Sequence, residues 1–185
     1  VNVSAKQFAH TSLVGDAQAA IHKAEIEPSS LQLEITESMA MADPDLTDRV
    51  LVQLKHLGVQ IGIDDFGTGH SSLSRLRRFP VDVIKIDRSF VHNMDADQVN
   101  RDIVNLIVTL AQNLNLKAVA EGVESPSHVM HLKQLQCKFA QGFFFSPPVQ
   151  VEKAEQLLAT SASPDEGENH ARASVARAGA AGTEP

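Results

Sequence analysis

Leu31-Gln32-Leu33-Glu34-Ile35-Thr36 alternates strictly between aliphatic and polar side chains. Because successive side chains of a β-strand point to opposite faces, this run predicts a strand with one apolar and one polar face. Val83-Ile84-Lys85-Ile86-Asp87 repeats the pattern, with Ile84 and Ile86 on the apolar face. An apolar sheet face has to be covered by helices, so the two runs predict an α/β protein.

Working outward, short β-rich runs alternate with helical patterns along most of the chain. The six runs expected as strands are Val1–Val3, Leu31–Thr36, Val59–Asp64, Val81–Ile86, Ala118–Glu121 and Phe139–Gln141. The six segments expected as helices are Phe8–Ala24, Leu46–Leu57, Ser72–Arg78, Val99–Leu114, Ser127–Leu135 and Val151–Leu158. This alternation predicts βα units and a mostly parallel sheet. Six units could complete a doubly wound open sheet, whereas a (β/α)₈ barrel would lack two.

Composition excludes several classes of protein. The 185 residues carry 16 basic and 23 acidic side chains, a net charge of −7, which argues against a protein that grips a nucleic-acid polymer. No apolar run approaches the ~20 residues of a membrane span, and the single cysteine, Cys137, allows no internal disulfide. We therefore expect a cytoplasmic globular domain without a membrane segment.

The end of the chain differs from the rest. Residues 160–185 contain Val175 as their only large aliphatic residue. So few apolar side chains cannot offset the entropy cost of ordering the segment. We expect residues 1–159 to fold and residues 160–185 to form a disordered tail.

Polar residues recur at the carboxyl ends of the expected strands. In chain order they are Asn2, Glu34 with Glu37, Asp64 with Asp65, Lys85, Glu121 and Gln141. A barrel would aim these side chains at one spot on its catalytic rim. The alternative is that Glu34, Asp64 and Lys85 form structural ion pairs or cap helices. The recurrence on successive strands favours a shared site.

Carboxylates that converge in a small space repel one another unless a cation lies among them. The oxygen-only donor set favours Mg²⁺ or Mn²⁺ over Zn²⁺. Adjacent Asp64 and Asp65 could bridge two ions, the arrangement used for phosphoester cleavage. Lys85 could then orient or acidify a water molecule.

The loop Phe66-Gly67-Thr68-Gly69-His70-Ser71-Ser72 follows this acidic pair. Its glycines and hydroxyls suit an anion-binding segment or a mobile lid. A tight turn would explain the same residues.

The stretch from Asp64 to Leu73 resembles the corresponding motif of the EAL domain, the bacterial cyclic di-GMP phosphodiesterase family. Five further segments are similar to family motifs in the same order. They are Asn2-Val3-Ser4, Leu33-Glu34-Ile35-Thr36-Glu37, Ile84-Lys85-Ile86-Asp87, Ala120-Glu121-Gly122-Val123-Glu124 and Gln141-Gly142-Phe143. Six ordered motifs make this a specific resemblance.

The resemblance implies a TIM-like barrel and hydrolysis of cyclic di-GMP to linear pGpG with Mg²⁺ or Mn²⁺. It implies metal ligands at Asn2, Glu34, Asp64 and Glu121, with Asp65 holding a second ion. Lys85, Glu121 and Asp65 would be catalytic, and Glu124 and Gln141 would make substrate-side and supporting contacts. Glu37, Thr68 and Gly69 would anchor the loop that ends at Leu73. Homodimers are common in the family, and a cyclase-like or sensor domain often precedes it.

Some features depart from the family pattern. The Glu-Ala-Leu motif is absent from the 185 residues. We expect this motif on a strand before Val1, so that the chain lacks the first strands of the barrel. We therefore expect the chain alone to have reduced stability or to associate by strand swapping, and to have little activity. His70 stands where an aromatic residue is usual, and Ser146-Pro147-Pro148 lacks a basic residue often found there.

Other candidate residues are assigned structural roles. We expect His128 and His131 to be surface residues, because no third metal ligand is visible. Phe143–Phe145 are expected in the core, with stacking on a guanine as the alternative. Cys137 is expected to be a core thiol.

Two other functions are weighed against a phosphodiesterase. A receptor would bind cyclic di-GMP without cleaving it, but receptors usually lose metal ligands within these motifs, and here every visible position is retained. Another metal-dependent (β/α)₈ hydrolase would require the ordered motifs to be coincidental.

Overall fold

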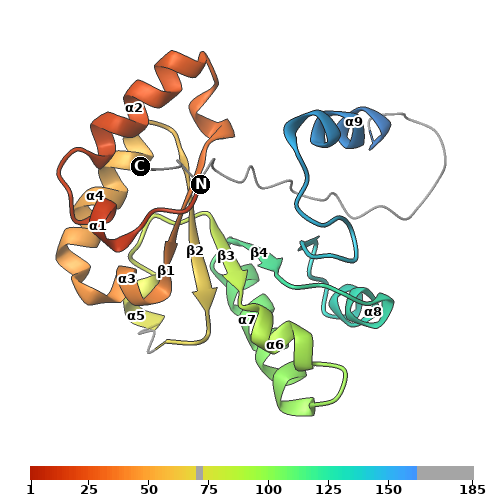
Figure 1. The fold of residues 1–185 in the computed structure, drawn as a ribbon. Coiled ribbons are helices and arrows are strands. Elements are labelled where there is room, and N and C mark those ends of the chain that lie inside the picture. Colours follow the sequence, from red (N-terminus) through yellow and green to blue (C-terminus); the bar gives the residue numbers. More distant parts are fainter. Residues whose placement is uncertain (70–72, 162–185) are drawn as a thin grey trace, which may run out of the picture.

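Five parallel strands form the centre of the structure, a computed structural model that describes residues 1–69 and 73–161 (Figure 1). The strands are β1 (Gln32–Thr36), β2 (Gln60–Phe66), β3 (Val83–Ile86), β4 (Lys117–Ala120) and β5 (Phe139–Ala140). They lie in the sheet in sequence order. Asn2 adds an isolated parallel bridge to Glu34, so the N-terminal segment runs beside β1. The predicted α/β organisation with parallel strands is confirmed.

Helices connect the strands. They are α1 (Ala5–Phe8), α2 (Leu13–Ala24), α3 (Glu37–Ala42), α4 (Pro44–His56), α5 (Leu73–Leu76), α6 (Arg88–Asn93), α7 (Gln98–Asn113), α8 (Pro126–Gln134) and α9 (Val151–Ser161), with a 3₁₀ turn at Pro28–Ser30. Among the described residues, no helix is both long enough and apolar enough to cross a bilayer.

The sequence analysis was wrong about three details of the helices. The helix expected from Phe8 to Ala24 begins only at Leu13, as α2. Phe8 is the last residue of a separate helix, α1, which starts with a capping box between Ser4 and Gln7. The helices α3 and α6 were not predicted, because each begins directly after a strand. Their N-caps, Thr36 and Asp87, accept hydrogen bonds from Met39 N and Ser89 N. The last residue of β1 and the residue after β3 therefore each start a helix.

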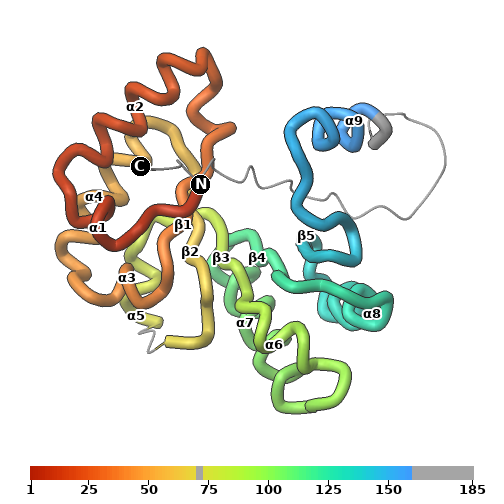
Figure 2. The backbone as a smooth tube through the Cα atoms, viewed as in Figure 1, coloured from red at the N-terminus to blue at the C-terminus, as the bar shows by residue number. Residues whose placement is uncertain are grey.

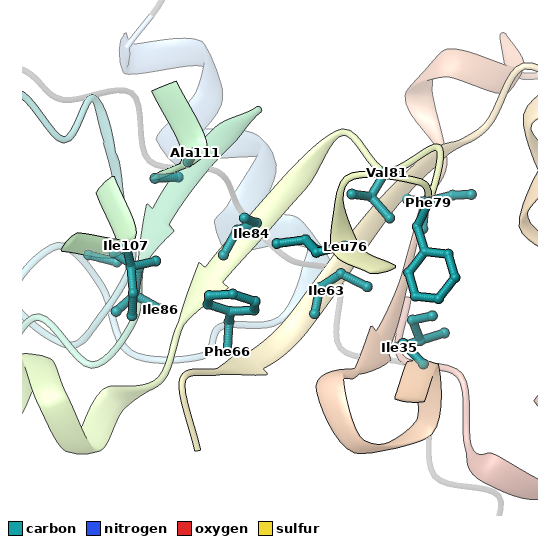
Figure 3. Packing of buried hydrophobic residues seen from close by; sticks show 14 of the residues in the cluster. Ile35, Ile63, Phe66, Leu76, Phe79, Val81, Ile84, Ile86, Ile107 and Ala111 are labelled. Atoms are coloured by element: carbon teal, nitrogen blue, oxygen red, sulfur yellow. The ribbon is translucent and has the colours of Figure 1, made fainter. Parts of the chain in front are cut away.

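The apolar face of the sheet forms the core. Figure 3 shows Ile84 and Ile86 of β3 beside Ile107 and Ala111 of α7. On the neighbouring strands, Ile35, Ile63 and Phe66 lie close to Leu76, Phe79 and Val81, and all these side chains are buried. Burial of each large aliphatic side chain contributes about 1.5–3 kcal/mol. The alternation seen in Leu31–Thr36 therefore fixes which sheet face the helices cover.

Within the described residues the sheet remains open, because β5 pairs only with β4 and the Asn2 bridge lies outside β1. Helix α9 lies away from strands β1 to β3 (Figure 2). It ends at Ser161, two residues inside the segment predicted to be a tail, and residues 162–185 lie outside the described part.

The prediction that Phe143–Phe145 lie in the core was wrong for two of the three residues. Phe143 is 67% exposed and Phe144 43% exposed, whereas Phe145 packs against the core. The strand expected at Phe139–Gln141 ends at Ala140, and the aromatic run lies in the turn that follows the sheet. Cys137 is buried, as predicted, and burial raises the pKa of its thiol.

Candidate active site

Lys85 lies at the centre of a cluster of carboxylates at the carboxyl ends of the strands. Its Nζ is 2.8 Å from Glu34 Oε2, 3.1 Å from Asp64 Oδ1 and 2.6 Å from Glu121 Oε1. The three acids come from β1, β2 and the residue after β4, and Lys85 comes from β3 between them. The convergence predicted from the polar strand faces is therefore found for these four residues, which we call the Lys85 cluster.

Two glutamines hold the outer acids of the Lys85 cluster. Gln32 Nε2 donates to Glu34 Oε1 (2.8 Å), and Gln141 Nε2 donates to Glu121 Oε1 (2.7 Å). Gly62 lies beside the first of these contacts, and a Cβ there would be in ordinary van der Waals contact with Gln32 Nε2 and Glu34 Cγ, each at 3.4 Å. Gln141 was singled out from the sequence, but Gln32 was missed, although it shares the polar face of its strand with Glu34.

The acidic pair at the end of β2 departs from regular strand geometry. The register with β3 shifts between Ile63 and Phe66, and Asp65 has a φ of 52°. Its backbone N–H donates to Asp64 Oδ1 (3.1 Å). Non-glycine residues take up this left-handed conformation only where their surroundings enforce it. The irregularity lets two consecutive acids face the same region.

Asp65 lies outside the contacts of Lys85 but close to other acids. Burial raises the pKa of its carboxyl, and the charges of Asp64 and Asp87 raise it further. Asn2 pairs with Glu34 in register, and paired residues on adjacent strands have side chains on the same face of a sheet. Asn2 and Asp65 thus flank the Lys85 cluster on two sides.

Glu37 connects the site to the loop after β2. This residue is 1% exposed, and its Oε2 accepts a hydrogen bond from Gly67 N (2.8 Å). Gly69 lies against the same carboxylate, since a Cβ there would be 2.6 Å from Glu37 Oε1. Thr68 does not share this contact; its Oγ1 donates to Asp65 O (2.9 Å). His70, Ser71 and Ser72 lie outside the described residues.

Glu124 is the one predicted site residue that lies apart from the others. Its side chain is half exposed, and its Oε2 is 3.6 Å from His92 Nδ1. Its backbone N–H donates to Nδ1 of His128 (3.3 Å).

His128 was expected on the surface, and this prediction was wrong: the side chain is 5% exposed and contacts Asp95, as does His131. Ser125 followed by Pro126 is typical of a helix start, but this local pattern does not indicate that His128 is buried.

The charges of the Lys85 cluster do not balance. Burial alone would lower the pKa of Lys85, but hydrogen bonds to Glu121 and Glu34 raise it, so the side chain stays an ammonium. Burial raises the pKa of Glu121, an effect that Lys85 opposes. Three carboxylates facing one ammonium leave two negative charges in excess.

The donor chemistry fits a hard divalent cation. All the surplus donors are oxygens, and the like charges around Asp65 would be relieved by a cation. Within residues 1–69 and 73–161, no three acidic, histidine or cysteine side chains already form a group that could hold an ion. The acids surround Lys85 instead, so to hold an ion their oxygens would turn from the ammonium towards it.

Comparison with protein families and curated proteins gives consistent matches. The model of the EAL domain family matches residues 1–148. The bifunctional diguanylate cyclase/cyclic di-GMP phosphodiesterase MucR of Pseudomonas aeruginosa is 48% identical over 162 residues, which is 88% of this chain and 23% of MucR. The cyclic di-GMP phosphodiesterase NbdA of the same species is 42% identical over 158 residues, 85% of this chain and 20% of NbdA. The chain thus spans less than a quarter of the length of these relatives.

Solved structures agree with these matches. The MucR phosphodiesterase in complex with c-di-GMP has a TM-score of 0.81 and 47% identity, covering 83% of this chain and 62% of that chain. The EAL domain of Mycobacterium smegmatis DcpA has a TM-score of 0.82 and 39% identity, covering 88% and 73%. The manganese and c-di-GMP complex of Klebsiella pneumoniae BlrP1 has a TM-score of 0.74 and 32% identity, covering 80% and 38%.

Proposed function

Since this chain belongs to the EAL domain family, we propose that it forms part of a phosphodiesterase domain that hydrolyses cyclic di-GMP to linear pGpG. The likeness to solved EAL structures confirms the expected TIM-like α/β fold, of which the described residues form five parallel strands. The observation that carries the proposal is the surplus of partly buried carboxylates around the buried Lys85 at the carboxyl ends of the strands, where (β/α)₈ enzymes have their active sites.

We propose Mg²⁺ or Mn²⁺ as the cofactor, with two ions in the site. Glu34, Asp64, Glu121 and Asn2 would hold the first ion, and Asp65 would contribute to the second. Divalent ions bound there would supply Lewis-acid activation of a water molecule and neutralise the charge of the phosphodiester. The manganese complex of BlrP1 supports the choice of a divalent ion.

Lys85 acts as a donor in this proposal. Its raised pKa keeps the ammonium protonated at neutral pH, so it can orient a water molecule or a phosphate oxygen but cannot accept a proton. Asp65 is better suited as the acceptor, because burial and the neighbouring Asp64 and Asp87 raise its pKa. Lys85 and Asp65 thereby divide the donor and acceptor roles.

The remaining predicted residues surround this centre. Gln141 fixes Glu121 through its hydrogen bond, and Glu37 anchors the loop after β2 through Gly67 N, with Gly69 beside it and Thr68 closing the turn on Asp65 O. Glu124, half exposed beyond the turn after β4, would contact the substrate.

For the whole protein we propose a cytoplasmic homodimer in which a cyclase-like or sensor domain precedes this one. The bifunctional cyclase and phosphodiesterase named MucR supports the upstream domain.

The alternative is a receptor that binds cyclic di-GMP without cleaving it. The observation in its favour is that, in the described part of the chain, no three acidic, histidine or cysteine side chains already form a group that could hold an ion. Retention of Glu34, Asp64, Lys85 and Glu121 in one cluster favours the enzyme.

The test is formation of pGpG from cyclic di-GMP with MnCl₂, followed by chromatography. It is run on the chain itself and on a chimera in which the strands that precede the matched segment of MucR are joined to Val1. We expect little product from the chain and turnover by the chimera. Lys85→Met should lower the rate of the chimera about 10²–10³-fold. The exposed Lys23→Met is the matched lysine control and should leave the rate unchanged.

A folded chimera that binds cyclic di-GMP and Mn²⁺ but releases no pGpG would contradict the enzyme and support the receptor. Turnover that survives Lys85→Met would contradict the assignment of the site.

A further inference from the structure

A buried histidine lies behind the turn that follows β4. Nδ1 of His128 accepts the hydrogen bond from the Glu124 N–H, and Nε2 lies 3.4 Å from Asp95 Oδ2. A neutral imidazole has one nitrogen that donates and one that accepts. Since Nδ1 accepts, the proton is on Nε2, which faces the carboxylate. The imidazole thus links Asp95 to the backbone of Glu124.

Asp95 is itself held in place from several sides. Ser127 Oγ donates to its Oδ2 (2.5 Å), and His131 Nδ1 lies 3.2 Å from its Oδ1. Arg101 donates to the carbonyl oxygen of Asp95 (3.1 Å). The hydrogen bond from Ser127 lowers the pKa of Asp95, and the nearby His128 and His131 lower it further, against the effect of burial. Asp95 is therefore an ionised, oriented partner for His128.

The turn itself carries two of the proposed functional carboxylates. Glu121 at its start contacts Lys85, and Glu124 lies at its end. In between, Gly122 has a φ of 69° and lies so close to Arg88 that a Cβ would be 2.7 Å from the Arg88 Cβ. Val123 N donates to Gln141 O (3.0 Å). These contacts fix the middle of the turn, and the His128 hydrogen bond fixes its far end.

We propose that His128, oriented by Asp95, is a positioning residue that sets the turn Glu121–Glu124 so that the Glu121 carboxylate reaches Lys85 and the divalent ion. This inference rests on the proposed function, because it assigns Glu121 to the metal site. Partners that orient metal-ligating groups change metal affinity without touching the ion. His128 does so through the backbone of the turn.

A purely structural role would make a different prediction. His128 also belongs to the start of α8, where Ser125 Oγ accepts a hydrogen bond from His128 N (3.1 Å). Loss of a helix cap lowers stability but leaves a metal site intact. Ser125 itself contacts Asp95 (3.5 Å) and Ser127, so the control is the cap of another helix. Asp43→Ala removes the cap of α4, where Asp43 Oδ1 accepts a hydrogen bond from Leu46 N (3.0 Å), and retains His128, Asp95 and Ser127.

The experiment measures Mn²⁺ affinity by calorimetry for the 185-residue chain and three variants, together with their melting temperatures. We expect His128→Leu to weaken Mn²⁺ binding about tenfold. His128→Asn should restore most of the affinity, since its amide can accept from Glu124 N and donate towards Asp95. Asp43→Ala should lower the melting temperature and leave the affinity unchanged. Nitrogen-15 spectra of the wild-type imidazole should show a bare Nδ1 and a protonated Nε2.

The inference is overturned if folded His128→Leu binds Mn²⁺ as tightly as the wild type, or if Nδ1 carries the proton. It is overturned together with the proposed metal site if the wild-type chain binds no Mn²⁺. The first pair of results leaves the proposed function standing, so the two failures are distinguishable.

Discussion

A lysine pairs with acidic side chains near the amino ends of the strands, and another does so at their carboxyl ends. The two arrangements differ in net charge. At the amino ends of the strands, Lys55 Nζ lies 2.8 and 2.9 Å from the two oxygens of Asp82. Ile61 N donates to the same carboxylate (2.8 Å), and Lys55 also donates to Val59 O (3.2 Å). At the carboxyl ends, Lys85 faces Glu34, Asp64 and Glu121.

The difference separates an ion pair that joins helix α4 to the residue before β3 from a site that can bind a cation. Lys55 and Asp82 balance each other in charge, and each side chain is 31% exposed. The carboxylate oxygens of Asp82 accept hydrogen bonds from the Lys55 ammonium and from Ile61 N. The Lys85 cluster is more deeply buried and has two negative charges in excess. Surplus charge costs stability, and proteins retain it where function requires it.

The largest expected contrast is between Lys85→Met and Lys55→Met. Removal of the Lys85 ammonium leaves three carboxylates, each only 11–16% exposed, without a counter-charge, so the free energy of unfolding should fall by about 3 kcal/mol. Lys55→Met should cost about 1 kcal/mol, because Asp82 is partly solvated and keeps its backbone donor. Urea unfolding of both variants without divalent metal measures the difference. Equal losses would show that the two lysines serve the same structural purpose.

Neutral replacements of the acids should have effects of opposite sign. Burial raises the pKa of Glu121, which means that its ionised form is disfavoured in the folded state. Glu121→Gln should therefore stabilise the metal-free chain. Asp82→Asn removes half of a balanced pair and should destabilise it by about 1 kcal/mol. Thermal melting of the two single variants decides this, and destabilisation by both would contradict the surplus of charge.

A smaller effect is expected at alkaline pH. The folded-state pKa of Lys85 is raised above its ordinary 10.5 by Glu121 and Glu34, despite burial. The folded state therefore keeps this proton longer than the unfolded state, and the stabilisation is complete below pH 10.5 and lost above it. Stability of the wild type should fall more steeply above pH 10.5 than that of Lys85→Met.

The comparison of the wild type with Lys85→Met above pH 10.5 is not complicated by tyrosine, whose hydroxyl would titrate in the same range, because the chain contains none. Burial raises the pKa of Cys137 above its ordinary 9.0, so the loss of stability from the thiol begins near pH 9 and is common to both proteins. Parallel curves above pH 10.5 would contradict the role given to Lys85.

Much of the Lys85 cluster could be predicted from the sequence, because strand alternation decides which side chains share a face. The two-residue alternation of side chains along a strand was enough to place Glu34 and Lys85 on the polar faces of their strands. Parallel strands bring their carboxyl ends to one edge of the sheet. Which acids contact Lys85 depends on the sheet order and on the register of β2 with β3, which no local pattern encodes.

The features that were missed depend on contacts between distant segments. His128 was expected on the surface because no third metal ligand was visible, and Asp95, which faces its Nε2, lies 33 positions earlier in the chain. Phe143 and Phe144 were expected in the core because aromatic runs at the closing strand of a barrel are usually buried, yet β5 ends at Ala140. The left-handed backbone of Asp65 is imposed by the irregular pairing of β2 and is invisible in its residue type.

The most direct test of the central claim is a calorimetric titration of Mn²⁺ into the 185-residue chain and two variants, Asp64→Asn and Asp82→Asn. If the surplus of charge at the carboxyl ends of the strands is a cation site, the wild type and Asp82→Asn bind Mn²⁺ with the same affinity and Asp64→Asn loses binding. Equal binding by all three proteins, or none by the wild type, would contradict it.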